Sequence, residues 1–403
     1  MVPLFVVAHF SHHLVMALLQ PLLPFIRDEF TISYTQASWI ASSFTLAYGL
    51  SQLPAGWLAD RIGPRILILI GTSGVAACGL FIGLSPTYII MVIPMILMGV
   101  LGGSYHPAAS PLVSASVDEK NRGRALGLHQ IGGTGSYFLT PLIAVGVAAL
   151  LGGWRGSFIS MSIVTILLGI GLYWLLGRRG YAGQSKTRAS KSSTEDVLTQ
   201  VHQRKTFIDL CRKVINFVIR WRKLIAFIIL GVVLQVAIFS TISFVTLFSV
   251  DHLRISKEAA AGLLTLAHFA GLWAGPLGGY LSDRIGAVPI LLFVCLITGP
   301  FIYLLGLTSP GWSVSVVLLV LGACQYMGMP VTEAYIISHI SERNRSTVLG
   351  FYYFASRGGP GLVMPALGYL LDRSGFATGF TVMGIASLAI TLCCVPFLWA
   401  KRD

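Results

Sequence analysis

Apolar runs long enough to cross a bilayer recur along the whole sequence, and they constrain the fold more than any other feature. A membrane-spanning helix needs about 20 predominantly apolar residues. Only 11% of the 403 residues are charged and the mean hydropathy is +0.79, whereas roughly a quarter of a soluble domain would be charged. We therefore predict an all-α membrane protein with twelve transmembrane helices, near residues 2–26, 36–58, 66–84, 88–116, 125–150, 155–177, 224–249, 258–281, 288–306, 312–338, 346–371 and 376–400.

The chain repeats itself at a fixed offset of 223 residues. The stretch from Gly56 to Gly63 returns, altered, from Gly279 to Gly286. Internal repeats of this kind are typical of transporters built from parallel repeats. We predict two pseudo-symmetric six-helix bundles, 1–177 and 224–403, joined by a linker at 178–223. Further matches at the same offset pair Gly99 with Gly322, Pro107 with Pro330, Glu119 with Glu342, Asn121 with Asn344, Arg122 with Arg345, Leu126 with Leu349 and Gly127 with Gly350.

Positive charge is distributed unevenly between the two faces of this layout. The net charge is +13, and 22 of the 28 Lys and Arg residues fall on one face, against five on the other. Cytoplasmic loops carry the excess of Lys and Arg. The pattern predicts a multi-pass protein of the cytoplasmic membrane with both termini in the cytoplasm. The basicity then reflects orientation in the bilayer, so we expect no nucleic-acid partner.

The second part of the predicted linker has an apolar stripe at helical spacing among many basic residues. A basic amphipathic helix binds the anionic inner leaflet of a membrane. We expect this segment to lie on the membrane surface, with binding to a partner protein as the alternative. The stripe consists of Phe207, Leu210, Cys211, Val214, Val218 and Trp221.

The repeated stretch contains a specific motif at the cytoplasmic end of the second predicted helix. Its pattern, GxLADRxGxR, resembles the cytoplasmic signature of the major facilitator superfamily. That resemblance implies a conformational latch, in which Asp60 braces a neighbouring helix end; a plain turn with a solvated charge pair is the alternative. The predicted latch residues are Gly56, Asp60, Arg61, Gly63, Arg65 and Arg122, with Gly279, Asp283, Arg284 and Arg345 in the second half.

Residues in the fourth and fifth predicted helices resemble one particular branch of the superfamily. The Tyr105-His106-Pro107 sequence in the fourth helix, followed by His129-Gln130 in the fifth, is similar to the fosmidomycin-resistance-type efflux branch of the superfamily. Drug/proton antiporters of the superfamily carry a Gly-Pro motif in the fifth helix. This chain has Thr140-Pro141 there instead, which weakens the expectation of drug export.

The first predicted helix carries a polar stripe. His9, His13, Met16 and Gln20 share one helical face, and polar groups inside a span must face a wet cavity or another helix. Substrate contact and simple helix packing are both open. Two histidines four residues apart also suit a metal, but no carboxylate or thiolate lies nearby in sequence, and the six cysteines form no CxxC pair. We predict no metal site and no cofactor.

Two formal charges lie well inside predicted spans, Glu333 in the tenth helix and Arg357 in the eleventh. An arginine at mid-helix costs about 2.5–3.5 kcal/mol on insertion scales, so a function or a partner must offset it. We expect Arg357 to bind an anionic group, with a structural ion pair to Glu333 as the alternative. Glu333 is the predicted proton carrier, with His106 and His129 as the competing carriers. The predicted substrate-binding residues are Arg357, His106, His129, Gln130, His9, His13, Gln20, Tyr326 and Tyr353.

Glycine and proline follow Arg357 directly, from Gly358 to Gly361. The repeat counterpart in the fifth helix is Gly135, which follows Gly132-Gly133. Interruptions at corresponding positions of two halves are the best sequence indicator of a midplane substrate site. We predict that the eleventh helix unwinds there and exposes backbone donors beside the guanidinium.

Together these features predict a secondary active transporter that moves a small organic solute, anionic in character, by alternating access and with proton coupling. The sequence has no GxxxxGK[ST] loop, so we expect an ion or solute gradient to drive it. A multidrug efflux antiporter and a passive uniporter or channel-like facilitator are the alternatives. A membrane enzyme is not expected. The expected partners are the substrate, the lipid bilayer and a coupling proton, with the chain as a monomer.

Overall fold

The computed structural model describes residues 2–118, 121–178 and 207–399, and every regular element in these residues is helical. The N-terminal half contains α1 (Val2–Met16), α2 (Leu19–Phe30), α3 (Tyr34–Ile62), α4 (Pro64–Leu69), η1 (Ile70–Gly74), α5 (Val75–Gly83), α6 (Tyr88–Gly102), α7 (Tyr105–Ala115), α8 (Arg122–Leu150) and α9 (Trp154–Arg178). The C-terminal half contains α10 (Phe207–Ile242), α11 (Val245–Asp251), α12 (Lys257–Phe269), η4 (Ala270–Leu272), α13 (Ala274–Ile285), α14 (Ala287–Leu305), α15 (Trp312–His339), α16 (Glu342–Tyr353), η5 (Phe354–Gly358) and α17 (Gly359–Trp399).

Ten stretches of the described chain are long and apolar enough to cross a membrane. The prediction of an all-α protein with many spanning helices is confirmed, although this criterion gives ten spans and not twelve. The helix α3 has 29 residues but is not among the ten. The last stretch, Thr347–Leu398, covers 52 residues and contains Gly375 in a non-helical conformation. The predicted twelve are reached only when α3 is counted and this stretch is divided at Gly375.

Large apolar side chains cover much of the outer surface. Ile93, Leu167 and Phe293, which lie on three different helices, are 60%, 65% and 61% exposed. Soluble monomers rarely expose apolar patches larger than a few hundred Å², whereas lipid stabilises such side chains. The exposed faces of these helices are therefore suited to acyl chains.

The backbone repeats the 223-residue offset. Six of the eight described residues with positive φ form three pairs at this spacing: Thr31 (49°) with Arg254 (57°), Gly63 (89°) with Gly286 (102°), and Gly152 (74°) with Gly375 (76°). Two helix N-caps also correspond, because Ser33 and Ser256 each accept a hydrogen bond from the backbone N–H three residues further on. Positive φ is uncommon outside glycine, so this agreement supports the predicted pseudo-symmetry.

Helix crossings within each half correspond as well. A Cβ added at Gly99 would lie 2.5 Å from a backbone oxygen of α3, and one added at Gly322 would collide with a backbone oxygen of α12. Glycine therefore allows the fourth predicted span to touch the second, and the tenth to touch the eighth. The obstructing residues are again 223 positions apart: Phe44 and Ala47 at Gly99, and Ala267 and Ala270 at Gly322.

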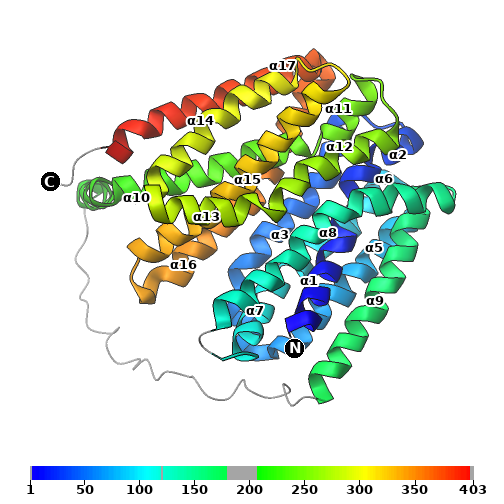
Figure 1. Cartoon of the computed structure of the whole chain (residues 1–403), viewed down its shortest axis with the longest axis horizontal. Coiled ribbons are helices and arrows are strands. Elements are labelled where there is room, and N and C mark those ends of the chain that lie inside the picture. The colour runs from blue at the N-terminus through cyan, green and yellow to red at the C-terminus, as the bar shows by residue number, and fades with distance from the viewer. Residues whose placement is uncertain (1, 119–120, 179–206, 400–403) are drawn as a thin grey trace.

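The two halves lie beside each other and come together at one end. Figure 1 shows α2 of the N-terminal half next to α11 of the C-terminal half at this end, while α7 and α16 lie apart at the other. The first and last described helix ends share the end that carries α7 and α16. By the predicted orientation this is the cytoplasmic end, and the end at α2 and α11 is external.

Part of the predicted linker lies outside the described residues, from 179 to 206. Residues 207–220 form the first part of α10, but their side chains also lie outside the description. The amphipathic segment is therefore an extension of the seventh predicted span. Its location on the membrane surface stays a prediction.

Candidate functional site

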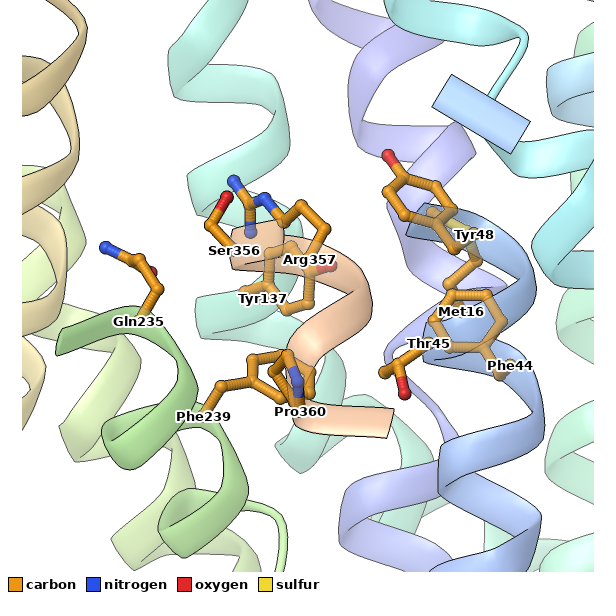
Figure 2. A pocket seen from close by; sticks show the side chains of 10 residues that line it. All are labelled: Met16, Phe44, Thr45, Tyr48, Tyr137, Gln235, Phe239, Ser356, Arg357 and Pro360. Atoms are coloured by element: carbon orange, nitrogen blue, oxygen red, sulfur yellow. The ribbon is translucent and has the colours of Figure 1, made fainter. Parts of the chain in front are cut away.

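A pocket lies between the two halves, around Arg357. Its empty volume is about 400 Å³, including the part that is open to solvent. Figure 2 shows the guanidinium between Tyr137 of α8, Tyr48 of α3 and Gln235 of α10, so that both halves contribute to its surroundings. The lining residues are Met16, Phe44, Thr45, Tyr48, Tyr137, Gln235, Phe239, Ser356, Arg357 and Pro360.

A widened turn of helix presents Arg357 to this pocket. The five residues of η5 form a π-helical turn, and α17 continues directly from Gly359. The predicted unwinding is therefore wrong: the chain keeps its backbone hydrogen bonds through a π-bulge, a feature frequent at functional sites. The close approach of the two halves at this turn explains Gly49 of α3, because a Cβ added there would lie 2.5 Å from the Cα of Gly358.

Within the described part of the chain, no carboxylate forms an ion pair with Arg357. Its Nη2 donates to the sulfur of Met329 at 3.2 Å. The predicted alternative, a direct ion pair with Glu333, is not formed. The Glu333 carboxyl instead lies within reach of the Tyr353 hydroxyl, and its Oε1 is buried without a hydrogen-bond partner.

Histidines from three helices meet in the N-terminal half. Nδ1 of His9 lies 2.8 Å from the backbone oxygen of His129, and Nε2 of His9 lies 3.1 Å from Nε2 of His13. The ring of His106, from the first turn of α7, is 5.0 Å from that of His9 and 5.5 Å from that of His13. We call His9, His13, His106 and His129 the histidine cluster. The chain breaks its helix between α6 and α7 immediately before His106, which directs this residue into the cluster.

Aromatic rings connect the histidine cluster to the C-terminal half. The ring of Tyr137 is 4.9 Å from that of His13 and 5.4 Å from that of His268 on α12. Nδ1 of His268 lies 2.9 Å from the hydroxyl of Tyr326, and Tyr105 bonds His129 at 3.2 Å. Tyr326 thus contacts the cluster's neighbour His268 and does not line the pocket; its role in substrate binding stays a prediction. Tyr48, Tyr105 and Tyr137 were not predicted, because a tyrosine in an apolar helix gives no sign of the face on which it lies.

Of the predicted substrate residues, Arg357 alone is among those that line this pocket. Two others, Gln130 and Gln20, lie outside both the pocket and the histidine cluster. Gln130 is exposed on α8, one turn before Thr134, and does not line the pocket. Gln20 bonds across the two halves: its Nε2 donates to Ser243 at 3.2 Å, and its backbone oxygen accepts from Thr246 at 2.7 Å. Gln20 thus joins the halves at the external side of the pocket.

The predicted latch is only partly described. The side chain of Asp60 and the surroundings of Gly56 lie outside the description, and Arg61 and Arg122 are exposed. Arg65 does not reach the second half, since its Nε donates to the backbone oxygen of Tyr173 at 2.7 Å.

In the C-terminal half, Asp283 is exposed and takes part in no ion pair among the described residues. The other members lie at helix ends: Gly63 and Gly286 end α3 and α13, Gly279 and Arg284 are on α13, and Arg345 donates weakly to the Ile340 oxygen.

The external end carries a polar network that joins the two halves, which we call the external network. Arg27 forms an ion pair with Asp251, and the Tyr34 hydroxyl donates to the same carboxylate at 2.7 Å. Lys257 reaches Asp28 at 2.6 Å. The side chain of Asp372 accepts hydrogen bonds from the backbone N–H groups of Tyr34 and Thr35 at 2.8 and 2.9 Å, so it caps the N-terminus of α3 from the opposite half.

Comparison with known proteins identifies the family. A sequence profile of the Major Facilitator Superfamily matches residues 5–272 and, separately, residues 227–403. The chain belongs to the Major Facilitator Superfamily. The two matches, which overlap at residues 227–272, agree with a repeated unit, and the superfamily resemblance of the Gly56–Arg65 motif is confirmed. The narrower resemblance to the fosmidomycin-resistance branch stays a prediction.

Several superfamily transporters are similar to this chain. The probable L-galactonate transporter of Escherichia coli K12 is 32% identical over 154 residues, which is 38% of this chain and 34% of that protein. The cis,cis-muconate transport protein of Acinetobacter baylyi is 25% identical and covers 94% of this chain and 88% of its own length. The multidrug resistance protein MdtG of Proteus mirabilis is 26% identical, with 81% and 77% coverage.

A solved structure shares the fold. A POT family transporter in complex with 5-aminolevulinic acid superposes with a TM-score of 0.79 at 15% identity, over 98% of this chain and 95% of that one. The family and these relatives establish a secondary transporter that spans a membrane several times. Members of the superfamily are transporters and not enzymes.

Proposed function

We propose that this transporter moves a small organic anion by alternating access, with the anionic group bound by Arg357 in the pocket between the halves. The observation that carries this proposal is a guanidinium between two tyrosines from the N-terminal half and Gln235 from the C-terminal half, with no carboxylate paired to it. A planar guanidinium binds a carboxylate or sulfonate through two parallel hydrogen bonds. Two of the relatives described above are named for organic acids, galactonate and muconate, which supports this substrate class.

The free-energy cost of burying a charge also supports an anionic substrate at Arg357. A charge removed from water needs a partner, since its desolvation otherwise costs several kcal/mol. The methionine sulfur that contacts Arg357 is only a weak acceptor. An anionic ligand would supply the missing partner and would contact both halves at once. Differential contact with two conformations is what lets a substrate shift their equilibrium.

Binding of anions by wild-type protein and by Arg357 variants tests this proposal. We expect a panel of small carboxylates and sulfonates to raise the melting temperature of purified wild-type protein in detergent. Truncating one partner of a buried charge pair costs about 2–5 kcal/mol, so Arg357→Ala should lower the affinity about 30-fold or more. Arg357→Lys keeps the charge but loses the planar fork and should also bind weakly.

Arg373 is the matched control, because it is exposed on α17 and lies outside the pocket. Arg373→Ala should bind anions as the wild type does. Equal anion affinity in the wild type and in both Arg357 variants would reject the proposal. A thermal shift with lipophilic cations instead of anions would favour multidrug efflux, which the likeness to MdtG keeps as the second candidate.

We also propose that Glu333 carries the coupling proton. Its Oε1 is buried without a partner, and an ionised carboxylate away from water is costly, a cost that protonation removes. Tyr353 and the charge of Arg357 lie within reach of the same carboxyl, so anion binding at Arg357 would change the field at Glu333. This coupling would link binding of the substrate to protonation of Glu333.

Proton-dependent uptake into vesicles tests this assignment. Glu333→Gln removes the titratable group at nearly constant volume, and we expect it to abolish the dependence of transport on a proton gradient while substrate exchange continues. His106→Gln is the matched comparison, since His106 is the competing carrier. A proton dependence that persists in Glu333→Gln and disappears in His106→Gln would transfer the role to the histidine.

A further inference from the structure

Three histidines of the cluster lie in the arrangement of a metal site. His9 and His13 are 2% and 7% exposed, on successive turns of α1, and His106 approaches them from α7. One ring nitrogen from each lies within 4.8 Å of the other two. The sequence alone shows only the pair on α1, because the third residue comes from a helix more than 90 positions away.

The spacing of the first two nitrogens fits a metal ligand pair. Metal–imidazole bonds of about 2.0–2.1 Å in tetrahedral geometry place two ligand nitrogens about 3.3–3.4 Å apart. The Nε2 atoms of His9 and His13 are 3.1 Å apart. His106, which is only partly buried, would complete a three-histidine set if its ligand nitrogen moved closer than the 4.8 Å that bounds the group.

The hydrogen bonds of the cluster leave a lone pair without a donor. Nδ1 of His9 faces a backbone carbonyl, which only accepts, so it carries the proton and leaves Nε2 of a neutral ring bare. Nδ1 of His13 is buried without a partner. If His13 is protonated at Nε2, its bare Nδ1 has no donor; if it is protonated at Nδ1, two bare Nε2 atoms face each other. A cation between the two Nε2 atoms supplies the missing partner in the second tautomer, in which both of these nitrogens are free to coordinate it.

The hydrogen bond from His9 to a backbone carbonyl is also characteristic of histidines that bind metals. Histidines that bind metals almost always donate their other ring N–H to a carbonyl or carboxylate, which fixes the ring and the tautomer. We propose that His9, His13 and His106 bind one transition-metal ion of the kind that prefers imidazole, such as Zn²⁺, Co²⁺ or Ni²⁺. Magnesium and calcium are not suited, since they prefer oxygen ligands. The three neutral ligands leave the ion its full charge and a fourth position for water or an anion.

Titration with Co²⁺ tests the proposal directly. The full-length protein, purified through a tag without histidines, should bind one Co²⁺ per chain and develop the visible absorption of a tetrahedral ion, which Zn²⁺ then displaces. His9→Gln, His13→Gln and His106→Gln should each weaken Co²⁺ binding about 100-fold or more, since even second-shell losses cost 10–100-fold. His252, an exposed histidine at the external end, gives the control His252→Gln, which should bind normally.

X-ray absorption of the Zn²⁺-loaded wild type keeps the test independent of variants that fail to fold. We expect three imidazole ligands at about 2.0–2.1 Å. Absence of stoichiometric binding, fewer than three imidazoles, or undiminished Co²⁺ binding in the three folded variants would overturn the proposal. A simple hydrogen-bonded pair of His9 and His13 gives the first of these results.

Discussion

A disulfide between the halves at the external end should stop transport, and reduction should restore it. Ser38 of α3 faces Gly368 of α17, and a Cβ added at Gly368 would lie 3.1 Å from the Cβ of Ser38. Disulfides have Cβ–Cβ distances of about 3.5–4.5 Å, so a separation of a few tenths of an ångström admits the bond. With Ser38→Cys and Gly368→Cys cross-linked, the external end cannot open and substrate uptake should fall to the level of empty vesicles.

The single variants are the controls for this experiment. Ser38→Cys alone should transport with or without oxidant. A Cβ at Gly368 lies 2.8 Å from the backbone oxygen of Tyr34, so Gly368→Cys alone sets the reference rate, which oxidant should not change. The double variant should recover that rate after treatment with dithiothreitol. Formation of the bond is followed by the mobility of the protein on a gel. A fully cross-linked double variant that still transports would show that the halves need not separate at this end.

A methyl group at Gly49 should have the second large effect. Its Cβ would lie 2.5 Å from the Cα and 2.6 Å from the nitrogen of Gly358, and backbone atoms cannot rotate away as a side chain does. Overpacking costs about 1–3 kcal/mol, and a bias of that size shifts a two-state equilibrium about 5–150-fold. Gly49→Ala should therefore favour the externally open state and slow transport.

Labelling from outside measures this shift. Thr45 lines the pocket and is 5% exposed, so Thr45→Cys should react slowly with an impermeant maleimide in the parent protein and faster when Gly49→Ala is added. Gly146 of α8 is the matched control, since nothing lies within 4 Å of a Cβ there. Equal labelling rates in the Gly49→Ala and Gly146→Ala backgrounds would contradict the expectation.

The architecture could be predicted from sequence because its determinants are local and repeated. Spanning helices follow from runs of apolar residues. The repeat at an offset of 223 residues is visible in the sequence alone, and the matching positive φ angles of Gly63 and Gly286 agree with it. Arg357 could also be identified from the sequence, because a charge within an apolar run is costly in the membrane whichever way its helix faces.

The site was less predictable because it depends on how helices face one another. Tyr48 and Tyr137 line the pocket, yet an apolar helix with small residues on several faces does not show which face is internal. Asp251 and Asp372 lie just beyond the predicted spans, where a carboxylate is expected to be solvated; only the structure shows them joined to the other half. The approach of His106 to His9 likewise depends on the break between α6 and α7.

Distances between spin labels test alternating access about the pocket most directly. One pair of labels at Leu151 and Leu307 reports the external end, and a second pair at Asp118 and Ile285 reports the cytoplasmic end; all four residues are exposed, with one of each pair in each half. Gly49→Ala should lengthen the first distance and shorten the second relative to the parent protein. If both distances stay unchanged, or both change in the same direction, the two halves do not rock about a central site.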